Sequence, residues 1–174
     1  MKVVLEPHAK EWADAFSRIL EKLHTNLRRD VEIHHIGSTA IPGIFAKPIV
    51  DILIGIDDGH ALGDYVEPIT AMGYGYIPEY EVYMPFRRYF VMLDQNNNHT
   101  QHLHLVYRGH TFFEDHLFFR DHLLHNPATA KQYEALKKRL SQKEWKDGNE
   151  YASAKSDFID AILEKKPKNP QIET

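Results

Sequence analysis

Cysteine is absent from the chain, which excludes a disulfide framework, thiolate zinc sites and a cysteine nucleophile. Any metal ion would therefore need histidine, aspartate or glutamate as ligands. The sequence also lacks the run of about 20 apolar residues that crosses a bilayer, and its N-terminal segment lacks the apolar core of a signal peptide. We therefore expect a cytoplasmic protein that does not bind membranes.

The sequence also lacks a large excess of positive or negative charge. The 21 lysines and arginines nearly balance 25 acidic residues, giving a formal net charge of -4, so general nucleic-acid binding is not expected. With 43% hydrophobic and 26% charged residues, the composition is typical of a globular protein. A length of 174 residues is enough for one domain with its own core. The sequence does contain 12 histidines, so their positions deserve inspection.

Hydrophobic periodicity predicts the order of helices and strands. Helices are predicted at 12–27, 62–72, 113–125, 129–140 and 151–163, and strands at 31–36, 49–56, 74–77, 88–93 and 101–107. The last two strands flank a polar turn and should form a hairpin. Strands early and helices late indicate an α+β fold, with a mixed sheet, helices packed on one side of it and a helical C-terminal third. We expect a single domain over 1–165 and a disordered tail over 166–174.

One acidic residue interrupts an otherwise apolar strand. The predicted strand 49–56 is apolar at nearly every other position and carries Asp51 near its start. Such a run is typical of a central strand covered on both faces. A carboxylate there costs several kcal/mol unless it is paired or bound to a cation. Asp51 is therefore either a ligand of a divalent metal ion or a carboxylate that pairs with Lys47 or caps neighbouring backbone.

The loop before this strand has features of a phosphate-binding loop. Gly37 and Ser38 can present backbone N–H groups and a hydroxyl to an anion, and Lys47 can add a positive charge. We assign Gly37, Ser38, Thr39 and Lys47 as the expected ligand-binding set. The alternative is an ordinary Gly-Ser turn, because the spacing of the glycines from Lys47 does not match a Walker loop.

Two histidines alternate along the last predicted strand. The period of two places His102 and His104 on one face of the sheet. If that face also carries Asp51, the three side chains form a carboxylate and two-histidine set suited to Zn, Mn or Fe. The cofactor expected for the protein is a divalent metal, Mg, Mn or Zn. The alternative is a pair of histidines hydrogen-bonded in a polar cleft. His35 is a weaker candidate for the same site.

Two adjacent arginines begin another predicted strand. Alternation allows only one of them to face the site, and we favour Arg88 over Arg87. Arginine binds phosphate or carboxylate through two parallel hydrogen bonds, although an arginine at a strand end is often solvated or paired at the surface. Lys155 on the last predicted helix is a weaker candidate.

The segment from His35 to Asp51 resembles the signature of the GrpB family: HIGST, a proline-glycine turn, AKP and an apolar strand with one aspartate. It is accompanied by Gly73-Tyr74, Arg87-Arg88-Tyr-Phe, His102-Leu-His104, Phe119-Arg-Asp121, Tyr133-x-x-x-Lys137 and Tyr151-x-x-x-Lys155. The resemblance covers nearly the whole chain and implies a nucleotidyltransferase-like fold.

The sequence departs from the wider nucleotidyltransferase pattern at one position. Those enzymes resemble one another in having Gly-Ser followed by two acids separated by one residue, which hold two metal ions together with a third acid. Asp51 matches the first acid, but Leu53 occupies the second position. This departure puts ordinary two-metal catalysis in doubt.

Three hypotheses about function follow. In the first, the protein binds a nucleotide or another phosphorylated small molecule and transfers a nucleotidyl group, with Asp51 and Arg88 as catalytic residues. Asp51, His102 and His104 then hold the metal, and the loop with Lys47 binds phosphates. In the second, the protein is a non-catalytic ligand-binding or regulatory module on the same fold. In the third, it is a hydrolase that uses a metal held by the two histidines and Asp51.

Overall fold

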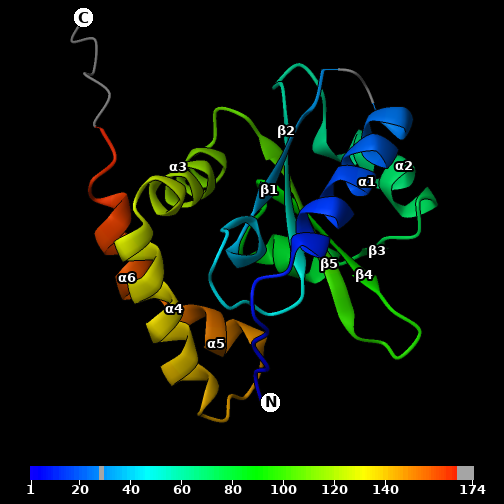
Figure 1. The fold of residues 1–174 in the computed structure, drawn as a ribbon. Helices are drawn as coiled ribbons and strands as arrows, with labels where there is room; N and C mark the ends of the chain where they lie inside the picture. Colours follow the sequence, from blue (N-terminus) through cyan, green and yellow to red (C-terminus); the bar gives the residue numbers. More distant parts are fainter. Residues whose placement is uncertain (28–29, 168–174) are drawn as a thin grey trace, which may run out of the picture.

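The computed structural model describes residues 1–27 and 30–167 (Figure 1). Within these ranges the helices are α1 (Lys10–Asn26), α2 (Val66–Ala71), α3 (Thr111–His125), α4 (Pro127–Ser141), α5 (Gly148–Ser153) and α6 (Ser156–Leu163). The strands are β1 (Glu32–Ile36), β2 (Val50–Ile56), β3 (Gly75–Tyr76), β4 (Arg87–Leu93) and β5 (His99–Tyr107). Short 3-10 turns are η1 (Ser38–Ala40), η2 (Leu62–Tyr65) and η3 (Pro78–Val82).

The strands form one mixed sheet in the order β1-β2-β5-β4-β3. The central strands β2 and β5 run parallel, whereas the other neighbouring pairs are antiparallel. Parallel strands in the middle of a sheet are covered on both faces, which explains the apolar run in β2. Asp51 is the one residue of β2 that is not fully buried.

The first face of the sheet carries the main hydrophobic core. Ile52 and Ile54 of β2 and Leu103 and Leu105 of β5 pack in one cluster with Leu23 of α1. α1 has apolar residues at helical spacing and therefore presents one apolar stripe to this face. α2 covers the same face through Ile69, which belongs to the same cluster.

The second face is only partly apolar. Leu53 and Val106 pack with Phe113 at the start of α3. The helices therefore cover both faces, which corrects the expectation that they lie on one side. A helical period defines an apolar stripe, but it does not determine which face of the sheet the stripe covers. The α+β class, the mixed sheet and the helical C-terminal third are confirmed.

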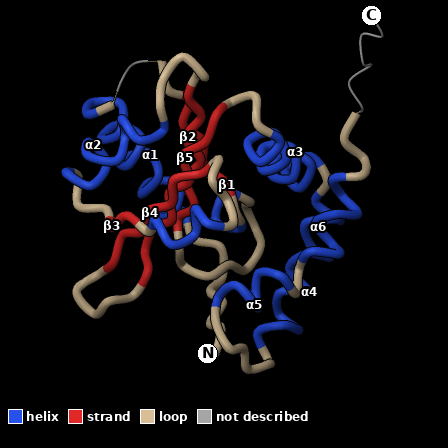
Figure 2. The backbone as a smooth tube through the Cα atoms, turned by 180° about the vertical axis from the view of Figure 1, so that it is seen from behind, coloured by secondary structure: helices blue, strands red, loops and turns tan. Residues whose placement is uncertain are grey.

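The C-terminal helices hold the loop between β1 and β2 in place. Ile41 and Ile44 of this loop belong to a cluster with Tyr133 of α4 and Ile162 of α6. Figure 2 shows these helices as a layer beside the sheet, on the side away from α1 and α2. The loop is thus packed against α4 and α6 through Ile41 and Ile44.

The predicted elements differ from the structure mainly at their ends. The predicted hairpin is confirmed, since β4 pairs with β5 in antiparallel register. The predicted helix over 151–163 is divided into α5 and α6 by a turn at Ala154 and Lys155. Of the predicted tail, 168–174 lies outside the described residues. Lys166 lies inside them, and its Nζ is 3.0 Å from carboxylate oxygens on α3.

Within residues 1–27 and 30–167, no helix has the length and apolar character of a membrane span.

Candidate functional site

Asp51 lies directly against the loop that follows β1. Gly37 has a φ of 71°, a left-handed conformation that favours glycine. A Cβ atom at this position would also collide with Oδ2 of Asp51. Glycine is therefore required for two independent reasons, and the collision shows how closely the loop backbone approaches the carboxylate.

The nearest ionic partner of Asp51 is a histidine on the neighbouring parallel strand. Asp51 and His102 are register partners, and Oδ1 of Asp51 lies 3.2 Å from Nδ1 of His102. On the far side of the same imidazole, Nε2 lies 2.9 Å from Nδ1 of His99. The structure thus forms a row of one carboxylate and two imidazoles. No ion pair between Asp51 and Lys47 is found in the described residues.

The predicted three-ligand metal set is not formed. His104 shares the face of His102, as alternation predicted, but its Nδ1 lies 3.2 Å from a guanidinium nitrogen of Arg87. Burial, followed by the charge of Arg87, holds the pKa of His104 well below its usual range. A cation beside the imidazole opposes metal binding. Across the described part of the chain, no group of three histidine or acidic side chains is arranged to hold a metal ion.

The arginines are placed opposite to the prediction. In the pairing of β4 with β5, Arg87 lies opposite Val106 and so shares the face of Asp51. Arg88 lies opposite Leu105 on the other face, where its guanidinium is 3.1 Å from Glu81. Strand alternation allows only one of the two arginines on the face of Asp51, and the pairing of β4 with β5 places Arg87 there. Arg88 is therefore not part of the candidate site.

Two lysines gather near Asp51 from distant parts of the chain. Lys47 comes from the loop and Lys155 from the turn between α5 and α6, and their ammonium groups lie 5.9 Å and 4.5 Å from the ring centre of Tyr151. Burial lowers the pKa of Lys155 to about 8, against the opposing effect of Asp51, and Lys47 lowers it further. Burial also lowers the pKa of Lys47, again opposed by Asp51. Both lysines are half-buried, so the site contains desolvated positive charge.

Thr39 of the predicted ligand-binding set has structural contacts instead. Thr39 is 2% exposed, and its Oγ1 donates to the carbonyl of Ile49 at 3.1 Å. The same oxygen lies 2.9 Å from Nε2 of His35. Because the threonine proton is already donated, it is the histidine that donates in this contact. These hydrogen bonds stabilise the loop in its buried part, so the hydroxyl of Thr39 is not free to bind a ligand.

His35 also lies on the other face of the sheet. Its ring stacks on Phe16 of α1 with a centroid distance of 4.8 Å. Burial lowers its pKa to about 4, so it is neutral near pH 7. The weaker prediction that His35 joins the site is therefore wrong.

Sequence reasoning gave no role to several aromatic side chains that line the site. Tyr133 is 5% exposed and hydrogen-bonds with Ser38. Tyr89 of β4 packs beside His102 and His104, with ring centres 5.7 Å and 5.1 Å away. The repeated Tyr-x-x-x-Lys spacing at Tyr133 and Tyr151 was the signal that would have identified two of them.

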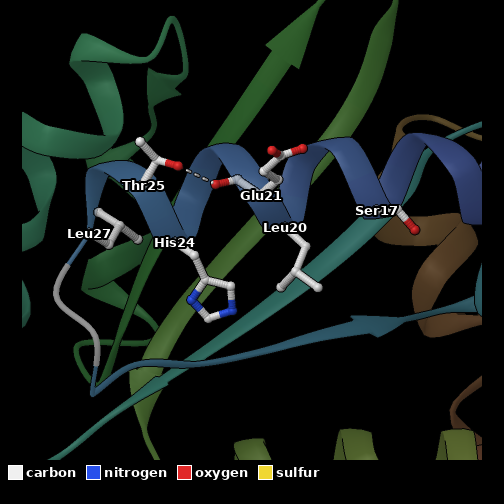
Figure 3. Close-up of a pocket in the computed structure, with 6 residues that line it drawn as sticks. All are labelled: Ser17, Leu20, Glu21, His24, Thr25 and Leu27. Carbon is white, nitrogen blue, oxygen red and sulfur yellow. Dashed lines mark hydrogen bonds between the residues drawn. The ribbon is translucent and has the colours of Figure 1, made fainter.

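A hollow lies along one side of α1 (Figure 3). It is lined by Ser17, Leu20, Glu21, His24, Thr25 and Leu27. Since α1 packs on the first face and Asp51 faces the second, the sheet separates this hollow from the candidate site. It has no grouping of charges comparable to that around Asp51.

Comparison with known proteins identifies the family to which this fold and its glycine-containing loop belong. The family model described as GrpB protein matches residues 2–165. The chain therefore belongs to the GrpB family.

Similar proteins extend over most of the chain. A UPF0157 protein of Streptomyces coelicolor is 35% identical over 162 residues, covering 93% of this chain and 83% of the relative. The glutamate-rich protein GrpB of Alkalihalophilus pseudofirmus is 33% identical, covering 93% and 94%. The crystal structure of the conserved protein GrpB from Enterococcus faecalis matches with a TM-score of 0.79 and 29% identity, over 92% of this chain and 95% of that one.

A shorter match has a different name. A dephospho-CoA kinase of Mycolicibacterium paratuberculosis is 38% identical over 76 residues. This match covers 41% of this chain but only 19% of the kinase.

Proposed function

We propose that the site around Asp51 binds the phosphates of a nucleotide or another phosphorylated small molecule and transfers a nucleotidyl group. The observation that carries this proposal is the pair Lys47 and Lys155, two half-buried cations beside one loop. Burying ammonium groups is costly unless an anion compensates them. A phosphate would compensate for the hydration that the ammonium groups lose on burial.

The loop suits the same ligand. Gly37 brings the backbone close to Asp51, and the hydroxyl of the half-exposed Ser38 lies at the start of η1. Backbone N–H groups in such a turn favour anions. The lysines would neutralise the phosphate charge that develops during transfer.

In the proposed step, an acceptor hydroxyl attacks the α-phosphorus of a nucleoside triphosphate. A new P–O bond forms, the bond to the β-phosphate oxygen breaks, and pyrophosphate leaves. The hydroxyl proton passes to Asp51, which His102 orients through the 3.2 Å contact. Asp51 is thus the catalytic base of the proposal.

A divalent metal fits only in a restricted way. Asp51 and His102 do not make a complete protein site, whereas Mg²⁺ commonly uses one or two carboxylates together with substrate phosphates. An ion bound with the nucleotide would be held by Asp51 and would neutralise phosphate charge. The proton transfer from the acceptor hydroxyl to Asp51 described above does not pass through the metal ion.

A second candidate function is a ligand-binding module without turnover. Leu53 occupies the position of the second acid, and it is fully buried in contact with Val106 and Phe113. This position thus belongs to the core. Binding of a nucleotide without release of pyrophosphate would favour this second function.

Thermal unfolding tests the binding proposal. ATP, other nucleoside triphosphates and dephospho-CoA would each be added with and without Mg²⁺, the last because of the kinase match. A ligand at 100 times its Kd should stabilise the fold by about 2.7 kcal/mol. Lys47→Met and Lys155→Met should lose this shift, whereas the exposed Lys143→Met should keep it. An equal shift in all variants, or no shift in any, would contradict the proposal.

A further inference from the structure

Arg87 lies in an aromatic enclosure beside the site. Its guanidinium carbon is 4.9 Å from the ring centre of Tyr89, 5.7 Å from that of Phe112 and 5.9 Å from that of Tyr80. The rings come from β4, α3 and η3. All of these side chains are half-buried. They surround the guanidinium on several sides and leave it partly exposed.

The positive charge of Arg87 has no protein counter-ion among the residues that the structure describes. One guanidinium nitrogen contacts Nδ1 of His104 at 3.2 Å. Because arginine only donates, this Nδ1 must be unprotonated, so His104 is neutral in this contact. Aromatic faces attract a cation, but they do not replace a carboxylate in a half-buried place. Within the described part of the chain, His104 is the hydrogen-bond partner found for this guanidinium, so its other N–H groups can donate to an anion.

The other arginines nearby differ in this respect. Arg88, the next residue, pairs with Glu81 at 3.1 Å. Arg108 pairs with Glu32 at 3.0 Å, and Arg120 with Asp121 at 2.7 Å. Arg87 thus differs from these three arginines in having no acidic partner among the described residues.

The charge count indicates the kind of anion. A single guanidinium presents two parallel N–H groups, which match one planar carboxylate. Its neighbour His104 is neutral and adds no second positive charge for a phosphate dianion. The aromatic walls also suit an apolar body attached to the carboxylate.

The aromatic enclosure of Arg87 also lies within reach of Asp51. Along β5, His104 is two residues from His102, a spacing of roughly 7 Å in a strand. Burial lowers the pKa of His116, while the charges of Asp51 and Arg87 act on it in opposite directions. Charge from both groups therefore reaches the same imidazole on α3.

We propose that Arg87 binds a carboxylate of the acceptor molecule in the transfer reaction. This inference rests on the proposed function. It assigns phosphate binding to Lys47 and Lys155 and carboxylate binding to Arg87 within the same site. The acceptor would place its hydroxyl near Asp51 and its carboxylate at the guanidinium. Arg87 is a binding residue for the substrate and takes no proton.

The test uses benzoate and its uncharged analogue benzamide as probes of the full chain without nucleotide. Saturation-transfer NMR would give the affinity of each probe for wild type, Arg87→Met, Arg87→Lys and Arg88→Met. We expect benzoate to bind better than benzamide and to lose roughly tenfold or more in affinity in Arg87→Met. Arg87→Lys should retain part of the affinity, because it keeps the charge without the fork. Arg88→Met should bind like wild type.

Other outcomes would overturn the inference. They are equal binding of benzoate and benzamide, equal binding by wild type and a folded Arg87→Met, or inorganic phosphate displacing benzoate at lower concentration than acetate does. The ATP shift in thermal unfolding separates this inference from the proposed function. If Arg87→Met loses benzoate but keeps the ATP shift, both stand. If wild type binds benzoate at Arg87 but shows no ATP shift, the transfer proposal and the acceptor role fail together, and only a carboxylate site remains.

Discussion

The two faces of the sheet are built from the same strands but have opposite chemical character. On the first face, Ile52, Ile54 and Leu103 are fully buried beneath α1 and α2. On the second, the adjacent positions are Asp51 and His102, which remain half-buried in contact with each other. Alternation along a strand thus places apolar side chains on one face and the polar side chains Asp51 and His102 on the other.

This comparison also explains how the protein tolerates charge in its central strands. Asp51, the charged residue of β2, lies on the second face and is half-buried there. There, Asp51 gains a partner from β5 and neighbours from the loop, so it avoids the cost of an unpaired carboxylate. A stable core on one side allows a polar site on the other.

The largest effect is expected from a substitution on the first face. Ile54→Ala removes a fully buried side chain and should lower the free energy of unfolding by about 2–5 kcal/mol. Urea denaturation measures the loss, and Val82→Ala, at a position 81% exposed, is the control. Nucleotide affinity per folded molecule should not change. A change in affinity comparable to the change in stability would show that the two faces are not separable.

Gly37→Ala should affect both stability and ligand binding. The left-handed φ costs about 1–3 kcal/mol for a residue with a side chain, and the new Cβ also displaces Asp51. Gly43→Ala is a matched control, because its φ is 78° but no atom lies within 4 Å of the added Cβ. Denaturation should show strain in both variants. Only Gly37→Ala should lose nucleotide binding, and equal loss in both would rule out the collision as the cause.

The pH dependence of Lys155 should have opposite signs for binding and for stability. The pKa of Lys155 is lowered to about 8 by burial, so phosphate affinity should fall as pH rises through 8. The unfolded lysine keeps its proton to about pH 10.4. Since the unfolded state then binds more protons, this group makes stability rise between these pH values.

Titration calorimetry with ATP and urea denaturation across this pH range measure the two effects. Lys155→Met should remove both slopes relative to wild type. A decline in affinity that persists unchanged in the variant would assign the titration to another group.

The smallest effect is expected at Arg88. Its pair with Glu81 is partly exposed, and such pairs contribute about 0–1 kcal/mol. Arg88→Met should change the midpoint of urea denaturation slightly and leave ATP and benzoate affinities unchanged. If Arg88→Met lost affinity for ATP or for benzoate, Arg88 would belong to the site, as the sequence analysis favoured. The assignment of Arg87 from the strand register would then be wrong.

Part of the site follows from local patterns. The position of Asp51 in an apolar strand, the alternation of His102 and His104, and the glycine at 37 are visible without a structure. Strand pairing confirms that Asp51 and the two histidines share a face. Their binding and catalytic roles remain predictions.

Other features depended on contacts that local patterns do not contain. Thr39 lies in the same loop as Ser38, but it turns inward to Ile49, whereas Ser38 is half-exposed. His104 shares a face with His102, but its imidazole contacts Arg87 instead of joining a metal set. A side chain's partner depends on the rotamer and on neighbouring elements, and strand period determines neither.

The sequence by itself determined the strand alternation, the α+β order of elements, and the glycine-containing loop before Asp51, because each depends on neighbouring residues. The tertiary structure decided that Arg87 faces the site, that helices cover both faces, and that Lys155 lies near Asp51. These features depend on the register of β4 against β5 and on the packing of the C-terminal helices. Such contacts join segments far apart in the chain, and only the folded core brings them together.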